Sequence, residues 1–315
     1  MLANMLTRRT FLAAPAGLAL LKQAAGARPR LPAGCRDAML KPLGAPDCWA
    51  AAKLVGAEVI EVTVDEKFGV PLLAHPQPYS VATPEGIARL SADLKKAGVK
   101  ISAFCVASRF DTRPDFEIDF CARLAGIAQH MGIRAMRIDV VNAKIPAADF
   151  VASAVPSLKK LVAASESTKV RFGVENHGPT ANDPAFLFPM LEQVGSKRLG
   201  VTLDTGNFYW FGHPLSKVYE LIEKVAPHVV HTHCKNIAYP ADQREVQRPR
   251  GWEYAKYEAP IDRGDIDFAR VVKTLQAAHY EGDLCVENET LNRHPEGERA
   301  GIIASEIAYL KKLRG

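Results

Sequence analysis

The sequence lacks the cysteine spacing of a structural zinc site or a redox dithiol. Its six cysteines include no C-x-x-C pair, and that spacing is typical of zinc ribbons and thioredoxin-like centres. Cys105, Cys234 and Cys285 lie inside apolar runs and are interpreted as small core residues. Cys35 and Cys48 are the one pair that we consider for a disulfide bridge.

The sequence also lacks the features of nucleotide-binding and nucleic-acid-binding proteins. No G-x-G-x-x-G follows the first predicted strand, so a dinucleotide-binding sheet would be without its phosphate loop. The formal net charge is +5, but three of the positive charges precede residue 27, and the rest of the chain is nearly neutral. No basic stripe interleaved with aromatic residues is present, so we expect no nucleic-acid partner.

The N-terminal apolar run is too short for a permanent membrane anchor. It covers Phe11–Leu21, follows Arg8 and Arg9, and precedes the A-x-A pattern of residues 25–27. The segment "TRRTFL" resembles a twin-arginine export signal. We therefore expect residues 1–27 to be an export signal and residues 28–315 to be an exported, periplasmic domain. The alternative is an N-terminal helix that is never cleaved.

What the sequence does contain is a regular alternation of strand and helix patterns. Eight strand candidates lie at residues 38–41, 57–64, 99–107, 133–141, 169–175, 198–204, 228–235 and 282–289. Helical periodicity covers residues 84–97, 116–131, 147–164, 184–194, 215–225, 268–278 and 299–313. The alternation predicts an α/β protein with a single (β/α)8 TIM barrel over residues 28–315. An open doubly wound sheet is the alternative.

The last four predicted strands end in polar residues. In a barrel of this kind, the chemistry lies at the C-terminal ends of the strands, and side chains two residues apart share a face. We therefore expect these ends to point into one cavity. They carry Glu175 with His177, Asp204 with Asn207, His231 with His233, and Glu287 with Glu289.

Three converging carboxylates repel one another and raise one another's pKa, and a divalent cation removes that difficulty. Carboxylate oxygens with one imidazole suit Mn²⁺, Mg²⁺, Co²⁺ or Zn²⁺. The predicted metal ligands are Glu175, Asp204, His233 and Glu287. The alternative is that each acid is a polar group at a strand end that forms a salt bridge with a neighbour.

These strand ends resemble the metal set of the xylose isomerase-like TIM barrels. The segments "GVENHG", "LDTGN", "HTHCKN" and "CVENE" carry the resemblance, and residues 259–287 resemble the family's last β-α unit. The resemblance spans Val55 to the C-terminus and implies that His233 is the histidine ligand. Asn236 stands where the family usually has aspartate, and Asn207 where some sugar epimerases have histidine.

The resemblance further implies a metal-dependent sugar isomerase or epimerase that acts on a small-molecule carbohydrate through an enediolate. Glu175 and Glu287 would then act as catalytic acid and base as well as ligands. The candidate substrate-binding residues are His177, Asn207, His231, Lys235 and Glu289, and His231 could instead support a ligand. Trp210 is a candidate for stacking on a sugar. The long segment from Ile237 to Ile261, with Trp252, Tyr254 and Tyr257, is expected to cover the site.

Three alternatives to this function remain open. A metal-dependent lyase or dehydratase shares the first proton abstraction and then eliminates a β-substituent from a 3-keto sugar or an inosose-like substrate. A nuclease of this shape needs further histidines on earlier strands, and the ends of the second to fourth strands offer Glu61, Cys105 and Asp139 instead. A non-catalytic sugar-binding barrel is the third. Formation of a homo-oligomer is also left open.

Overall fold

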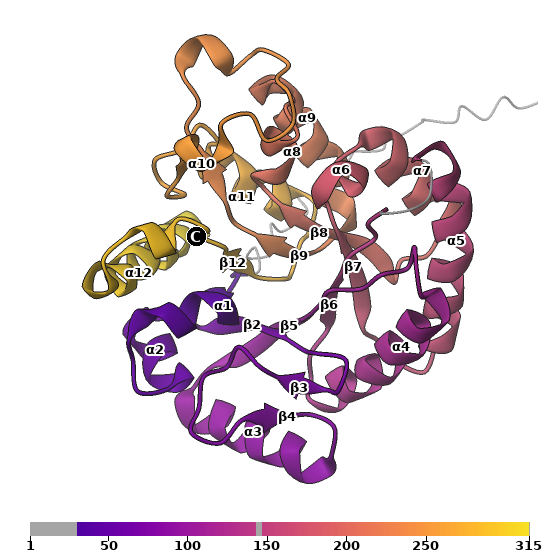
Figure 1. Ribbon diagram of the computed structural model, residues 1–315, viewed down its shortest axis with the longest axis vertical. Helices are drawn as coiled ribbons and strands as arrows, with labels where there is room; N and C mark the ends of the chain where they lie inside the picture. Colours follow the sequence, from indigo (N-terminus) through magenta and orange to yellow (C-terminus); the bar gives the residue numbers. More distant parts are fainter. Residues whose placement is uncertain (1–29, 143–146, 315) are drawn as a thin grey trace, which may run out of the picture.

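Eight parallel strands form a barrel in the computed structural model, which describes residues 30–142 and 147–314 (Figure 1). The strands are paired in the order β12-β1-β2-β5-β6-β7-β8-β9. A bridge between Cys234 and Val286 joins the last strand to the first, and the Cys234 amide donates to the Cys285 carbonyl at 2.6 Å. The (β/α)8 barrel predicted from the sequence is confirmed, whereas the proposed export signal lies outside the described residues.

The barrel strands agree with the predicted ones in seven of eight cases. They are β1 Ala33–Arg36, β2 Val59–Thr63, β5 Lys100–Val106, β6 Ala135–Ile138, β7 Arg171–Glu175, β8 Leu199–Asp204, β9 Val229–His233 and β12 Leu284–Val286. Two small antiparallel pairs lie outside the barrel: β3 Gly69–Val70 with β4 Tyr79–Ser80, and β10 Asn236–Ile237 with β11 Glu258–Ala259.

The first strand was predicted in the wrong place. Residues 38–41 were expected to be extended, but Asp37–Leu40 form the short helix α1, and the strand is the preceding Ala33–Arg36. This strand is short, and its Gly34 packs so closely on β2 that an added Cβ would lie 1.7 Å from the Val59 carbonyl oxygen. A small residue is required there, so the strand shows none of the branched apolar pattern used to find the others.

Helices surround the barrel on its outer side. The longer ones are α2 Cys48–Leu54, α3 Pro84–Ala97, α4 Pro114–His130, α5 Ala147–Ala164, α7 Pro184–Val194, α9 Leu215–Val225, α11 Phe268–Ala277 and α12 Glu296–Leu313. Short helices occupy several strand-to-helix connections: α6 Gly178–Ala181, α8 Asn207–Trp210, α10 Tyr254–Tyr257, and the 3₁₀ turns η1 Lys41–Leu43, η2 Ala226–His228, η3 Ala241–Gln243 and η4 Leu291–Arg293. All seven predicted helices are present.

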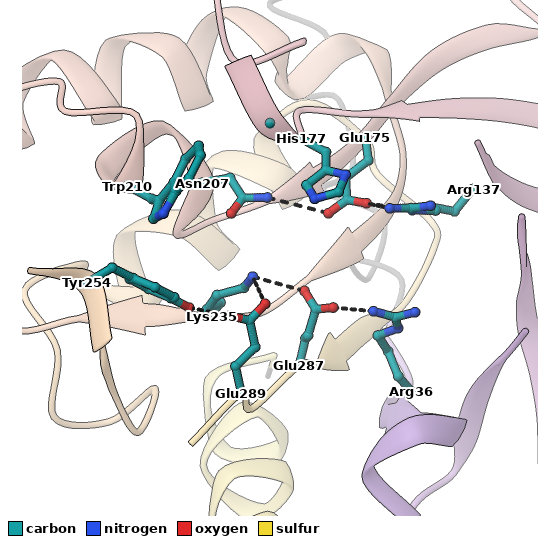
Figure 2. Close-up of a pocket in the computed structure, with 11 residues that line it drawn as sticks. Arg36, Arg137, Glu175, His177, Asn207, Trp210, Lys235, Tyr254, Glu287 and Glu289 are labelled. Atoms are coloured by element: carbon teal, nitrogen blue, oxygen red, sulfur yellow. Dashed lines mark hydrogen bonds and ion pairs between the residues drawn. The ribbon is translucent and has the colours of Figure 1, made fainter. Parts of the chain in front are cut away.

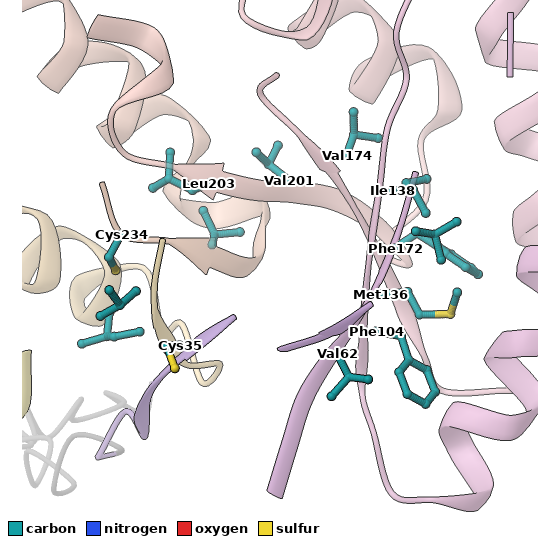
Figure 3. Close-up of a cluster of buried hydrophobic side chains, with 14 of the residues drawn as sticks. Cys35, Val62, Phe104, Met136, Ile138, Phe172, Val174, Val201, Leu203 and Cys234 are labelled. Carbon is teal, nitrogen blue, oxygen red and sulfur yellow. The ribbon is translucent and has the colours of Figure 1, made fainter. Parts of the chain in front are cut away.

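The main apolar core lies between the strands and the helices (Figure 3). Val62, Phe104 and Phe172 are fully buried there, and each contributes about 1.5–3 kcal/mol of apolar burial. Because successive side chains of a strand point to opposite faces, residues one position away, such as Glu61 and Cys105, face the barrel axis. This alternation brings buried polar groups to the barrel mouth.

All six cysteines are buried as free thiols, so the bridge considered between Cys35 and Cys48 is not formed. Cys35 lies in β1 and Cys48 begins α2. Burial raises the pKa of both thiols, that of Cys48 to about 12. The described residues contain no helix with the length and apolarity needed to cross a bilayer.

Candidate metal centre

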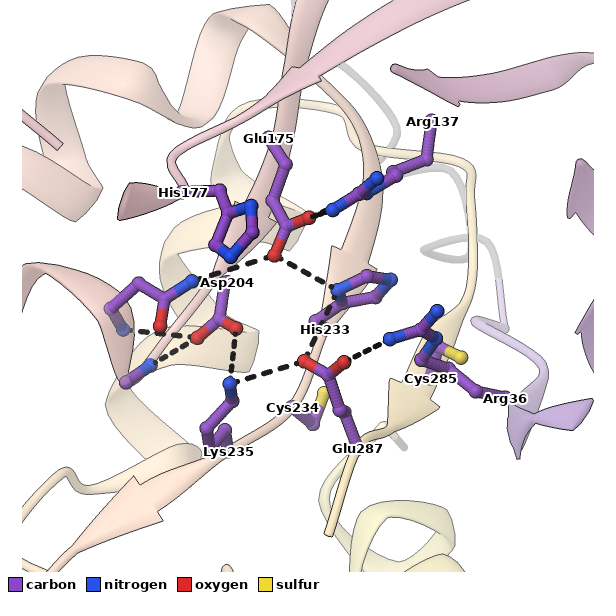
Figure 4. A network of polar contacts seen from close by, with 12 residues as sticks. Arg36, Arg137, Glu175, His177, Asp204, His233, Cys234, Lys235, Cys285 and Glu287 are labelled. Carbon is purple, nitrogen blue, oxygen red and sulfur yellow. Dashed lines mark hydrogen bonds and ion pairs between the residues drawn. The ribbon is translucent and has the colours of Figure 1, made fainter. Parts of the chain in front are cut away.

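Four consecutive strands of the barrel bring the predicted ligand set together (Figure 4). Glu175 ends β7, Asp204 ends β8, His233 ends β9, and Glu287 follows β12. All four are buried, and one potential ligand atom of each lies within 4.8 Å of those of the other three. Each of the three acids also forms a salt bridge with a neighbouring side chain, as the alternative expected, but the four ligand candidates nevertheless share one centre.

The turn after β8 orients Asp204. Its Oδ1 accepts hydrogen bonds from the backbone amides of Gly206 (2.8 Å) and Asn207 (3.0 Å). Its own amide donates to Asn176 Oδ1 at 2.8 Å. Its Oδ2 is buried and accepts no hydrogen bond from any residue that the structure describes, although Lys235 Nζ lies 3.0 Å away. One oxygen is thus fixed by the backbone and the other is left for the centre.

Two arginines hold the glutamates in a matching way. Arg137 binds Oε2 of Glu175, and Arg36 binds Oε1 of Glu287. The other oxygens, Glu175 Oε1 and Glu287 Oε2, each lie 3.3 Å from Nδ1 of His233. Each glutamate therefore offers one oxygen to a guanidinium group and turns the other to the centre.

His233 presents Nδ1 to the centre because its Nε2 lies 2.9 Å from Oε1 of the buried Glu61. His231 lies behind it, with Nε2 3.1 Å from the same Glu61 oxygen and Nδ1 2.6 Å from Asp283 Oδ1. Both ring nitrogens of His231 thus face carboxylates. Its side chain is fully buried and does not line the cavity, so it is placed as a support of His233 and not in contact with substrate.

The electrostatics of the centre favour an added positive charge. Burial, together with the charges of Glu287 and Glu175, raises the pKa of Asp204 to about 7 against the lowering effect of Lys235 and His233. Burial also raises the pKa of Glu287, but Lys235, His233 and Arg36 outweigh it and hold that pKa well below its usual range. The pKa of His233 is well above its ordinary value, because Glu61, Glu287 and Glu175 overcome the effect of burial. A donor set of carboxylate oxygens and one imidazole nitrogen fits a divalent cation. Lys235 Nζ lies 3.0 Å from Asp204 Oδ2 and 3.2 Å from Glu287 Oε2 and neutralises part of their charge.

Two neighbouring groups also contain possible ligands, namely Glu61 with His231 and Cys285, and Asp139 with Glu175 and His177. In the second group, Arg137 already bridges the carboxylates, with Nη1 2.6 Å from Asp139 Oδ2. Arg137 thus contacts both carboxylates of that group, and the four-residue cluster, which offers one more ligand atom and is buried throughout, is the better candidate.

A cavity of about 290 Å³ lies above the centre and is lined by Glu175, Glu287 and the residues around them (Figure 2). His177, Asn207, Lys235 and Glu289, four of the five predicted substrate-binding residues, line its wall. Trp210 lines it too, and so does Tyr254, whose hydroxyl donates to Glu289 Oε2 at 2.7 Å.

The long segment between β10 and β11 reaches the cavity only through Tyr254 among its described residues. Trp252 and Tyr257 stack on each other with ring centroids 5.7 Å apart. The buried Arg248 holds the segment, donating to the carbonyls of His213 (2.9 Å) and Val246 (3.0 Å). This segment therefore covers the site chiefly by packing.

Asn236, which departs from the family pattern, has a structural use. Its Nδ2 donates to the carbonyls of Ile261 and Ile266, both at 2.9 Å, and its Oδ1 accepts from the Ile266 amide at 3.0 Å. These contacts fasten both ends of the loop that follows β11, and Asn236 does not line the cavity.

Sequence reasoning missed Arg36 and Arg137 and gave Glu61 no part in the centre. Arg137 pairs with Asp139 and also binds Glu175. Arg36 was overlooked because β1 was placed too late in the chain. With the correct bounds, Arg36 is the last residue of a strand and would have been examined with the other strand ends.

Comparisons with known proteins agree with the barrel fold. The model of the family described as "Xylose isomerase-like TIM barrel" matches residues 49–313. The chain belongs to this family. A xylose isomerase domain protein from Planctomyces limnophilus has a TM-score of 0.65 at 18% identity and covers 91% of this chain and 98% of its own. A xylose isomerase-like TIM barrel protein from Mycobacterium smegmatis, solved with magnesium, has a TM-score of 0.65 at 16% identity, over 90% of this chain and 96% of its own.

An L-ribulose 3-epimerase shares the xylose isomerase-like barrel as well, with a TM-score of 0.62 at 14% identity, over 90% of this chain and 96% of its own. At these identities the likeness concerns the fold. An uncharacterised protein of Methanocaldococcus jannaschii is 25% identical over 140 residues, which is 43% of this chain and 42% of that protein. The chain thus spans less than half the length of this relative.

Proposed function

We propose that the protein is a divalent-metal-dependent isomerase or epimerase of a keto-sugar or related polyol. The observation that carries the proposal is the placement of Glu175 and Glu287. Both line the cavity, and both turn one oxygen to the centre from opposite sides of His233. Two carboxylates facing one substrate can remove a proton from one side of a carbon and return it to another position. The epimerase and the magnesium-bound protein among the structural neighbours support this assignment.

The residues divide the chemistry as follows. Held by Glu175, Asp204, His233 and Glu287, a divalent cation would supply positive charge against the oxygens of an enediolate. Arg137 and Arg36 keep the two glutamates ionised and therefore ready to accept a proton. Each glutamate is consequently a weak base, so it can act only on a C–H bond that an adjacent carbonyl makes acidic. Asn207, whose Nδ2 lies 3.4 Å from Glu175 Oε1, orients that carboxylate.

The cavity suggests the kind of sugar. Its volume of about 290 Å³ is at the lower end of small-molecule sites, which suits one sugar unit. Among the described residues that line it, each cationic side chain faces a carboxylate: Arg36 faces Glu287, Arg137 faces Glu175, and Lys235 faces Glu289. Since no cation is left over for a phosphate, we propose a neutral sugar in preference to a sugar phosphate.

The test is turnover of a panel of free keto-sugars by metal-depleted protein restored with Mn²⁺, Mg²⁺, Co²⁺ or Zn²⁺. We expect turnover only after metal is restored, and Glu175→Gln should lower it by ~10²–10⁴-fold. Unchanged turnover in Glu175→Gln, with substrate binding retained, would rule out the catalytic assignment.

A lyase is the second candidate, because His177 is placed to protonate a leaving group. It lines the cavity, and its Nδ1 lies 2.9 Å from Asp139 Oδ1. This hydrogen bond raises the pKa of His177 and so favours the imidazolium form, which holds at Nε2 the proton that the leaving group would take. Elimination of a β-hydroxyl or a glycosidic oxygen would follow the same proton abstraction. Product analysis separates the two candidates, since an enone or enol absorbs ultraviolet light and an epimer does not.

We also propose that residues 1–27 direct the protein to the periplasm by the twin-arginine route. Replacing Arg8 and Arg9 together by lysine should leave the protein in the cytoplasmic fraction. Export that is unchanged by this pair of substitutions would contradict the proposal.

A further inference from the structure

Glu61 is a fully buried carboxylate that the proposed reaction does not use. It lies on β2, on the side of the barrel away from the ligand strands. Its Oε1 faces Nε2 of His233 at 2.9 Å and Nε2 of His231 at 3.1 Å, and its Oε2 lies 2.8 Å from Arg36 Nε. Glu61 therefore touches one candidate metal ligand directly and reaches a second, Glu287, through Arg36.

The contact with His233 determines which ring nitrogen carries the lone pair. An ionised carboxylate oxygen only accepts hydrogen bonds, and a neutral imidazole has one N–H and one acceptor nitrogen. A nitrogen that binds a cation uses its lone pair for it, so a ligating His233 keeps its single N–H on the other nitrogen, and the contact of Nε2 with Glu61 places that N–H at Nε2 and leaves Nδ1 for the cation. Nδ1 is also the atom that lies 3.3 Å from both Glu175 Oε1 and Glu287 Oε2.

Glu61 is itself held in place by two further side chains, His231 and Arg36. His231 shares its Oε1 and is anchored by Asp283 at 2.6 Å, while Arg36 holds its Oε2. Glu61, His231 and His233 are all 0% exposed. The carboxylate therefore cannot turn away from His233 without breaking the contacts on both of its oxygens.

We propose that Glu61 is a positioning residue that fixes His233 as the Nε2–H tautomer and thereby presents Nδ1 to the metal. The inference rests on the metal site proposed above. Carboxylates that orient a ligating histidine typically change metal affinity by ~10–100-fold when they are removed. Glu61 acts at a sequence separation of 172 residues from the histidine that it orients.

The first test needs no variant. Histidine-selective ¹⁵N labelling of the full chain, with long-range ¹⁵N–¹H correlation spectra of the zinc-loaded protein, reports the state of each ring nitrogen. We expect His233, assigned by loss of its signals in His233→Gln, to be metal-bound at Nδ1 and protonated at Nε2. Ligation through Nε2 would overturn the inference while leaving the metal site intact. Failure of the wild-type protein to bind zinc would overturn both the inference and the proposed function.

The second test compares two buried glutamates. Glu61→Gln should weaken zinc binding, measured by competition with a chelator, by ~10–100-fold. Glu117→Gln is the matched control, because Glu117 is buried on α4, binds Arg113 at 2.7 Å, and neither lines the cavity nor belongs to the ligand cluster. It should change zinc affinity by less than about twofold. Equal zinc affinity in Glu61→Gln and the wild type would overturn the inference, and if circular dichroism shows Glu61→Gln to be unfolded, the spectra of the wild-type protein decide.

Discussion

The two halves of the barrel mouth bury charge in different ways. The ligand half, at the ends of β7, β8, β9 and β12, turns acids and an imidazole toward a common centre. The guanidinium half, at the ends of β1, β2 and β6, pairs its charged groups with those atoms of the ligand half that face away from the centre. The ligand half consists of Glu175, Asp204, His233 and Glu287, and the guanidinium half of Arg36, Glu61 and Arg137.

The difference shows how a barrel can keep a metal site assembled. Buried charges are costly unless they are paired, and removing one partner of a buried pair is strongly destabilising. Arg36 and Arg137 pair with Glu287 and Glu175 but occupy only one oxygen of each. The guanidinium half thus stabilises the anions of the ligand half without filling the place between them.

The largest expected effect comes from breaking the guanidinium half at Arg137. Arg137→Met leaves Asp139 and Glu175 buried without their cation, which should cost about 3–5 kcal/mol in the free energy of unfolding by urea. It should also raise the pKa of Glu175, which Arg137 and His233 lower against the effect of burial. The acid limb of the pH–activity profile should therefore move to higher pH.

The control for Arg137→Met is Arg123→Met. Arg123 lies 3.6 Å from Asp119 in an exposed ion pair, and such pairs contribute at most about 1 kcal/mol. If both variants lose equal stability, the guanidinium half has no special part in holding the site.

The support behind His233 predicts an unusual dependence of stability on pH. The pKa of His231 is raised to about 9, because Asp283 and Glu61 outweigh the lowering effect of burial. Because the pKa of His231 is higher in the folded protein than the unfolded value near 6.5, its protonation stabilises the folded protein fully below pH 6.5. That stability is lost as the pH rises through about 9. In EDTA, the free energy of unfolding should fall by roughly 3 kcal/mol over this window. His231→Gln should flatten the curve, and a wild-type curve that rises between these pH values would contradict the interpretation.

Within the ligand half, Asp204→Asn should have opposite effects on metal binding and on stability. Loss of one ligand should weaken zinc binding by at least ~100-fold. Without metal, however, the variant should be the more stable protein above pH 7, because burial and the nearby glutamates make ionisation of Asp204 unfavourable and raise its pKa to about 7. Urea unfolding in EDTA at pH 8 checks the second point, and a less stable variant would show that Asp204 is not a strained anion.

Most of the fold was predictable because periodicity is a local property. Seven strands and all seven expected helices lie where the alternation placed them. The exception is β1, where the close approach of Gly34 to Val59 of the next strand requires a residue without a side chain. That contact is tertiary, and the local pattern of apolar residues does not reveal it.

The ligand half was also predictable, since the rule that strand ends meet at one edge required only the positions of the strands. The guanidinium half was not, because its role depends on which side chains meet across the barrel. Glu61 was recognised as lying near an inward end, yet its contact with His233 joins residues 172 positions apart. A single sequence indicates which residues face inward, whereas pairings between them follow from the closed geometry of the barrel.

The smallest expected effect concerns the cover of the site, which belongs to neither half. Tyr254 donates to Glu289 Oε2 at 2.7 Å, and Glu289 Oε1 in turn lies 2.8 Å from Lys235 Nζ. Tyr254→Phe removes one hydrogen bond worth about 0.5–1.5 kcal/mol, so KM for the sugar should rise a few-fold with kcat nearly unchanged. Tyr257→Phe is the control, because Tyr257 stacks on Trp252 and does not line the cavity. A large fall in kcat for Tyr254→Phe would place this segment in the chemistry itself and extend the reacting groups beyond the two halves of the mouth.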